Sequence, residues 1–224
     1  MSTASSAPSA LSADRVTLDR RVPPLGGFNL TYLGIELKRR LRNRRTLFFT
    51  IAFPVVMYVI IGLRLRDEQL TETPVAAGGV SVAAYIMVSM AMYGAMMSAT
   101  QTGAAVALER TQGWSRQLRL TPLNPLVNII IKMIAGMVLG LLAVVVTYAA
   151  GAISGIQLSV GQWIGTGLVG WVLASAVFTT LGLFVGYLMP SENAAQVTSL
   201  VVVFLSFLGG LFYPLSSMPD FMQT

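Results

Sequence analysis

The sequence predicts an all-α integral membrane protein, a polytopic bundle of five spanning helices preceded by an amphipathic helix at the membrane interface. Of its 224 residues, 54% are hydrophobic and only 11% are charged, whereas an ordinary soluble domain has about a quarter charged residues. Residues 73–108, 133–191 and 193–219 contain no charged side chain. Because a spanning helix needs about 20 apolar residues, these stretches fit a bilayer, and a water-soluble globule is excluded.

The N-terminal part of the chain has a different composition from the rest. Residues 1–27 are rich in Ser, Ala and Pro and lack the apolar core of a secretory signal. Asp14 and Asp19 count against a transit peptide. We expect a disordered cytoplasmic tail over 1–27, an interfacial amphipathic helix over 28–45 and a transmembrane domain over 46–224.

The interfacial helix is predicted from leucines at helical spacing among charged residues. Its apolar positions include Leu33, Leu37 and Leu41, and its basic positions include Lys38, Arg39 and Arg40. The leucines would enter the acyl boundary and the cations would meet anionic lipid headgroups. The alternative is that the cations only fix the membrane topology. Nucleic-acid binding is not expected this close to a membrane span.

The five spans follow from the uncharged stretches. Residues 133–191 must contain two helices, because one helix of that length at about 1.5 Å per residue would be far longer than a bilayer is thick. Residues 154–162 form the natural turn between them. The predicted spans are 46–63, 80–105, 128–152, 163–188 and 194–213.

The basic residues predict the orientation of the chain in the membrane. Six cations lie at 38–45, directly before the first span, and Lys132 is assigned with three arginines to the segment between spans two and three. Arg64 and Arg66 lie on the opposite side, beside acidic residues. Because positive residues stay in the cytoplasm, the N-terminus is expected there, and residues 214–224 are expected to face outward.

The residue types that are missing restrict the chemistry. The chain has no His and no Cys, which excludes zinc and haem sites built from them, thiol nucleophiles and a Ser-His-Asp triad. Neither Lys38 nor Lys132 lies in a phosphate-binding G-x-x-x-x-G-K-[ST] motif, and the long uncharged stretches offer no carriers for protons. We therefore expect no catalytic residues and no metal site, and energy for uphill transport would have to come from another polypeptide.

Such a partner would need a structured cytoplasmic surface, and residues 106–127 are the one inward loop long enough to form it. A short helix is expected there, on which Trp114 and Leu118 share a face. Trp and Arg together are typical of binding hot spots. The alternative is that Trp114 lies in the headgroup belt and the arginines hold the topology. The candidate coupling residues are Glu109, Arg110, Gly113, Trp114, Arg116 and Leu118.

Two motifs in the chain are distinctive. The first is Glu109-Arg110, Gly113 and the Leu-Arg-Leu-Thr-Pro-Leu run at 118–123. The second is Gly-Gly-Leu-Phe-Tyr-Pro-Leu-Ser-Ser-Met-Pro at 209–219. Together they resemble the type-2 ATP-binding-cassette (ABC) permease family, the membrane subunits of bacterial exporters of drugs, antibiotics and polysaccharides. The resemblance covers roughly residues 30–224 and implies a permease domain over 46–224 with an outward re-entrant segment over 214–224.

The resemblance also implies the partners and the location. Two permease chains, identical or different, would join two cytoplasmic ABC ATPase subunits in the bacterial inner membrane, with ATP and Mg²⁺ on the ATPase and no cofactor on this chain. The interfacial helix and the loop helix would dock on the ATPase. Members have six spans, so we expect a last helix beyond the sequence given, or else an unusual five-span form.

The residues that could face the substrate are predicted from the composition of span two. Span two is rich in Met and Tyr, and Tyr85, Met92 and Met96 fall near one face. Flexible thioethers could line a path for a lipophilic drug, antibiotic or lipid-like substrate, although ordinary packing between helices explains the same residues.

A passive channel, a membrane scaffold and a lipid-modifying enzyme are the alternative function classes. An enzyme would need a carboxylate cluster, and the acidic group at 67–72 is explained as a solvated loop.

Overall fold

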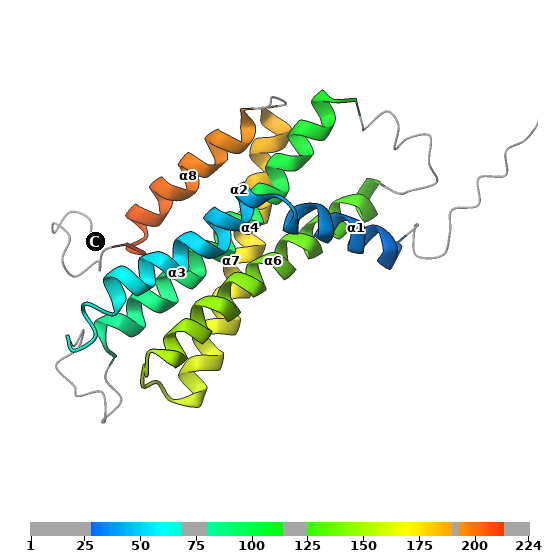
Figure 1. Ribbon diagram of the computed structural model, residues 1–224. Coiled ribbons are helices and arrows are strands. Elements are labelled where there is room, and N and C mark those ends of the chain that lie inside the picture. The colour runs from blue at the N-terminus through cyan, green and yellow to red at the C-terminus, as the bar shows by residue number, and fades with distance from the viewer. Residues whose placement is uncertain (1–27, 69–79, 114–124, 190–192, 213–224) are drawn as a thin grey trace, which may run out of the picture.

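The computed structural model describes residues 28–68, 80–113, 125–189 and 193–212, which form an all-α bundle (Figure 1). No β-strand occurs within these ranges. The helices are α1 (Leu30–Leu41), α2 (Arg44–Leu47), η2 (Phe48–Ala52), α3 (Phe53–Met57), η3 (Tyr58–Gly62), α4 (Val82–Thr111), α6 (Pro125–Ile153), α7 (Val160–Leu188) and α8 (Ala194–Leu208). The predicted all-α membrane fold is confirmed.

Four segments are long and apolar enough to cross a membrane: Arg44–Gly62, which we call the first span, Val82–Thr111, Leu126–Ile153 and Val160–Leu188. They correspond to the first four predicted spans. The fifth predicted span is also a helix, but α8 has 15 residues and is shorter than the predicted range 194–213. It ends at Leu208 with Gly209 as its cap, and Gly210 follows with a φ of 75°, the left-handed conformation that commonly terminates helices.

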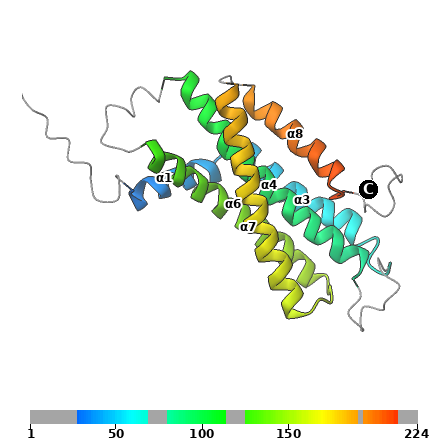
Figure 2. The ribbon, with the colours of Figure 1, turned by 180° about the vertical axis from the view of Figure 1, so that it is seen from behind.

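α4 is the central helix of the bundle, and α6, α7, α8 and the first span all pack against it (Figures 1 and 2). Small residues let the neighbouring backbones come close. A Cβ atom on Gly186 would lie 2.5 Å from the carbonyl oxygen of Gly103, and one on Gly182 would lie 2.5 Å from that of Thr100. Small residues at such crossings are typical of membrane helices. The Gly182-x-x-x-Gly186 pair therefore serves packing within this chain.

The first span is irregular, with π-helical turns at η2 and η3 on either side of α3. Pro54 explains the first of them, because a proline has no N–H to donate to the carbonyl of Thr50 four residues earlier. The N–H of Phe53 instead donates to the carbonyl of Phe48, five residues back. π-Helical turns are frequent at functional sites.

Three predicted features lie outside the described residues. These are the tail 1–27, the coupling residues Trp114, Arg116 and Leu118, and the segment 214–224. They remain predictions.

Candidate functional site: a buried charge cluster and an adjoining groove

α1 crosses the N-terminal part of α6 at an angle to the bundle (Figures 1 and 2). It begins where the side chain of Asn29 accepts a hydrogen bond from the N–H of Thr31, which caps the helix. One face of α1 presents Glu36 and Arg40, separated by one turn, and these side chains are buried. α1 is therefore held to the bundle through charged residues.

This arrangement agrees with the predicted interfacial helix in part. Leu33 and Leu37 are half-buried, and Lys38 and Leu41 are exposed. Arg39 is half-exposed. Arg40 differs from the prediction, because its guanidinium is buried against Glu36 and is not available to a lipid headgroup. The physical reason is that Glu36, one turn earlier, supplies the opposite charge inside the protein.

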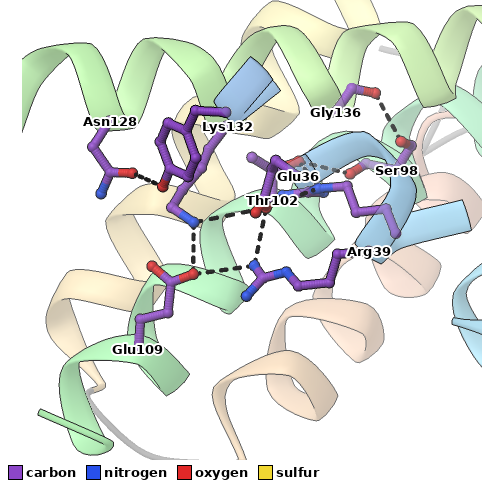
Figure 3. A network of polar contacts seen from close by, with 10 residues as sticks. Glu36, Arg39, Ser98, Thr102, Glu109, Asn128, Lys132 and Gly136 are labelled. Atoms are coloured by element: carbon purple, nitrogen blue, oxygen red, sulfur yellow. Dashed lines mark hydrogen bonds and ion pairs between the residues drawn. The ribbon is translucent and has the colours of Figure 1, made fainter. Parts of the chain in front are cut away.

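Five charged side chains meet where α1, α4 and α6 come together, and we call them the charge cluster: Glu36, Arg39, Arg40, Glu109 and Lys132 (Figure 3). Lys132 Nζ lies 2.6 Å from Glu109 Oε1 and 3.7 Å from Glu36 Oε1. Arg39 Nη2 lies 3.0 Å from Glu36 Oε1 and 3.1 Å from Glu109 Oε1. Each carboxylate is thus shared between two helices or more.

The predicted position of Lys132 is wrong. The charge pattern of the sequence assigns it to the segment between spans two and three, but it lies inside α6 and is 1% exposed. A buried ammonium is costly unless it is paired, and both of its partners come from other helices. The distribution of charge along the sequence does not reveal this pairing.

Neutral polar groups extend the cluster. Tyr32 OH donates to Asn128 Oδ1 over 2.6 Å, which joins α1 to α6. Arg40 Nη1 donates to Thr102 Oγ1 over 2.8 Å, and Thr102 Oγ1 donates to the carbonyl of Ser98 over 3.1 Å. Figure 3 shows how these contacts surround the ion pairs. Together they hold α1 to both α4 and α6.

The electrostatics of α1 follow from burial and from these neighbours. Burial alone would raise the pKa of Glu36, but Lys132, Arg40 and Arg39 together lower it below its ordinary value. Burial, and then Glu109 and Glu36, raise the pKa of Tyr32. Glu36 is therefore a carboxylate at neutral pH, and removing one of its three cations would weaken the compensation of a buried charge.

The predicted coupling residues can be placed as far as Gly113. Glu109 lies in the last turns of α4 and belongs to the charge cluster, so the first part of the predicted loop 106–127 is helical. Arg110 donates to the carbonyl of Tyr187 over 3.3 Å and lies 5.0 Å from the centre of its ring. Gly113 follows the helix with a φ of 75°. α4 thus leads from the charge cluster directly into residues 114–124.

The three residues predicted for a substrate path have different neighbours. Tyr85 OH donates to the carbonyl of Gly210, after α8. Met92 lies against Gly170 of α7, and Met96 is buried in the core. These positions fit the packing alternative, and none of the three side chains lines the groove described next.

A groove of about 790 Å³ does lie between the first span, α4 and α8. Arg39, Arg45 and Gln112 line its end beside the charge cluster, whereas Tyr93 and Val203 line it further along α4 and α8. Gln101 of α4 donates to Ser199 of α8 over 2.8 Å, and both residues border the groove. The groove is not evident in the sequence, because its wall comes from three separated segments.

Sequence comparisons identify the family. Residues 30–224 match the model of the family described as ABC-2 type transporter. The chain is 31% identical over 196 residues to the "Putative transport permease YvfS" of Bacillus subtilis (strain 168), covering 84% of this chain and 75% of the relative. No solved structure matches. The chain therefore belongs to the ABC-2 type transporter family, and it is a multi-pass membrane permease of an ABC transporter.

Proposed function

We propose that this chain is the permease subunit of an ATP-driven exporter in the bacterial inner membrane, which moves a lipophilic drug, antibiotic or lipid-like substrate out of the cytoplasm or the inner leaflet. A separate ATPase would supply the energy. The observation that carries the proposal is the charge cluster, because it joins α1 to the part of α4 that leads into the predicted coupling segment.

The cluster supports a mechanism for transmitting force. Glu36 and Glu109 share Lys132 and Arg39, so the end of α4 and α1 are expected to move as one unit. When ATP closes the ATPase pair, a push on residues 114–124 would shift both elements. α4 contacts the other long helices, so its displacement would reach the whole bundle. ATP can bias the bundle only by favouring one of its conformations.

The proposed assembly contains two permease chains, identical or different, and two ATPase subunits. α1 and the helix expected around Trp114 and Leu118 would form the seat for each ATPase, and the ATPase would bind ATP and Mg²⁺. The N-terminus and the charged end of the bundle would face the cytoplasm. The exposed cations of α1, including Lys38, would lie near the anionic headgroups of the inner leaflet.

The test is to co-express the full chain with the ABC ATPase proposed as its partner and to purify the pair. Trp114→Ala combined with Leu118→Ala should abolish most of the substrate-stimulated ATPase activity and leave membrane insertion intact. Ile153→Ala is a suitable control, because Ile153 is 88% exposed at the other end of α6. Unchanged stimulation in the double variant would contradict the seat, and a chain that purifies with no ATPase would favour a channel or scaffold.

A further inference from the structure

The groove between the first span, α4 and α8 combines features that point to one class of ligand. We propose that it binds an amphipath with one anionic headgroup, a phospholipid-like molecule drawn from the adjacent leaflet, with the headgroup at Arg45 and the tail against Phe49, Tyr93 and Met97. This inference rests on the proposed transport function and names the substrate class of that function.

The charge at the open end of the groove favours an anion. Arg39, Arg40, Arg45 and Glu109 all line the groove. Arg39 and Arg40 are paired with the cluster carboxylates, whereas no ion pair joins Arg45 to an acidic side chain anywhere in the described ranges. Counting Glu36 and Lys132 behind them, four cations face two carboxylates. A negative headgroup would offset part of this excess of positive charge.

A buried hydroxyl in the wall of the groove has no partner. Thr50 is 1% exposed, and its Oγ1 makes no hydrogen bond. Thr100 and Thr147, by contrast, each donate to the carbonyl four residues earlier, over 2.8 and 2.9 Å. Thr50 lies in the π-helical turn η2. Leaving a buried hydroxyl unpaired is unfavourable, so a polar group of a ligand, such as an ester below the headgroup, would stabilise this position.

Beyond Thr50 the walls are apolar. Phe49, Tyr93, Met97 and Val203 provide aromatic, thioether and aliphatic surface from three helices. Methionine adapts its shape to irregular apolar ligands. The volume of about 790 Å³ is within the usual range of ligand sites. A small soluble anion would leave these walls unused.

Aromatic rings pack together beyond the far end. The ring centres of Phe53 and Tyr93 are 5.6 Å apart, those of Tyr93 and Phe212 are 5.4 Å apart, and Phe207 stacks on Phe212 at 4.6 Å. None of these rings except that of Tyr93 lines the groove. A ligand would therefore enter at the charged end and extend its tail toward this ring stack.

The test uses the full chain, purified and reconstituted in phosphatidylcholine nanodiscs with a trace of phosphatidylglycerol carrying a photoreactive group in one acyl chain. Mass spectrometry of the labelled peptides should place the label near Tyr93, Met97 or Val203. A phosphatidylcholine probe with the same acyl chain should label these positions several-fold less. Inorganic phosphate should not displace the phosphatidylglycerol probe.

Matched variants localise the headgroup. Arg45→Gln should lower groove labelling by about tenfold, the loss expected for a charge-assisted contact, and Thr50→Val by about threefold. Arg44→Gln is the control, because Arg44 is exposed and does not line the groove. Size-exclusion profiles identical to wild type would show that the variants fold.

Three results would overturn the proposal: equal labelling by both lipids, equal losses in Arg45→Gln and Arg44→Gln, or displacement by phosphate alone. The assay contains no ATPase. If the expected labelling is not found while ATPase coupling is intact, the substrate class is rejected and the exporter function is retained. If the groove is labelled but the chain recruits no ATPase, the substrate class is retained and the exporter function is rejected.

Discussion

The two ends of α4 are held in different ways. At the end near Thr111, Glu109 pairs with Lys132 of α6, and Thr102 accepts a hydrogen bond from Arg40 of α1. At the end near Ser81, Met87 and Met90 pack with Tyr58 in an apolar cluster. Paired charges therefore stabilise the charged end of α4, and close apolar packing stabilises the other end. Perturbations of the two ends should therefore differ in their response to pH and to charge.

The largest effect is expected at Lys132. Lys132→Met would remove the cation closest to Glu109 and one of the three cations that surround Glu36, so stability should fall by about 3–5 kcal/mol. Thermal unfolding in detergent would measure the loss. Lys38→Met, which removes an exposed lysine of α1, should change little.

A double variant sharpens this prediction. Adding Glu109→Gln to Lys132→Met removes the carboxylate that has lost its closest cation, so part of the lost stability should return. A double variant that is less stable than Lys132→Met alone would show that the pair does not compensate in this way.

The apolar end should respond next most strongly. Met87 is fully buried and lies against Gly151 of α6. Met87→Ala should destabilise the protein by about 2–4 kcal/mol through the cavity that it leaves. Denaturant unfolding at two pH values should give the same loss at both, because no charge is involved. A loss that changes with pH would contradict the contrast between the ends.

The pH dependence of the charged end is a smaller effect. Because the pKa of Glu36 in the folded protein is below its ordinary value of 4.5, its contribution to stability is present above pH 4.5 and is lost as the pH falls through the lowered pKa. Wild type should lose stability over that window more steeply than Glu36→Gln. Melting temperatures between pH 6 and pH 3 would measure the difference, and parallel curves would contradict it.

The smallest effect is expected at Arg110. Its guanidinium lies over the ring of Tyr187 in an exposed position. Arg110→Gln should lower stability by only about 0.5–1 kcal/mol, as expected for an exposed cation–π contact. A melting-temperature shift as large as that of Lys132→Met would mean that Arg110 belongs to the charge cluster.

The fold could be predicted from the sequence to a large extent, because the absence of charge over tens of residues is a strong signal for membrane helices. The first four spans agree with the structure within a few residues. α8 was predicted too long, since apolar residues continue through Gly209 and Gly210 while the backbone turns there. A hydropathy profile does not detect the turn at these glycines.

The candidate site was predictable only in part. Glu109 was identified through a motif, whereas Glu36 and Lys132 were not, because their pairing joins residues that are far apart in the sequence. The spacing of Glu36 and Arg40 by one helical turn was a usable signal for an internal pair. The groove forms where the first span, α4 and α8 diverge, and no local sequence pattern predicts that arrangement.

The central claim is that α1 and the end of α4 move as one unit when the ATPase closes. Spin labels on exposed Ile35 and Gln112 report the distance between them, and a label at Ile153 reports the far end. In the permease–ATPase complex, a non-hydrolysable ATP analogue should leave the Ile35–Gln112 distance unchanged and shift the Gln112–Ile153 distance. A change in the Ile35–Gln112 distance on nucleotide binding would contradict the claim.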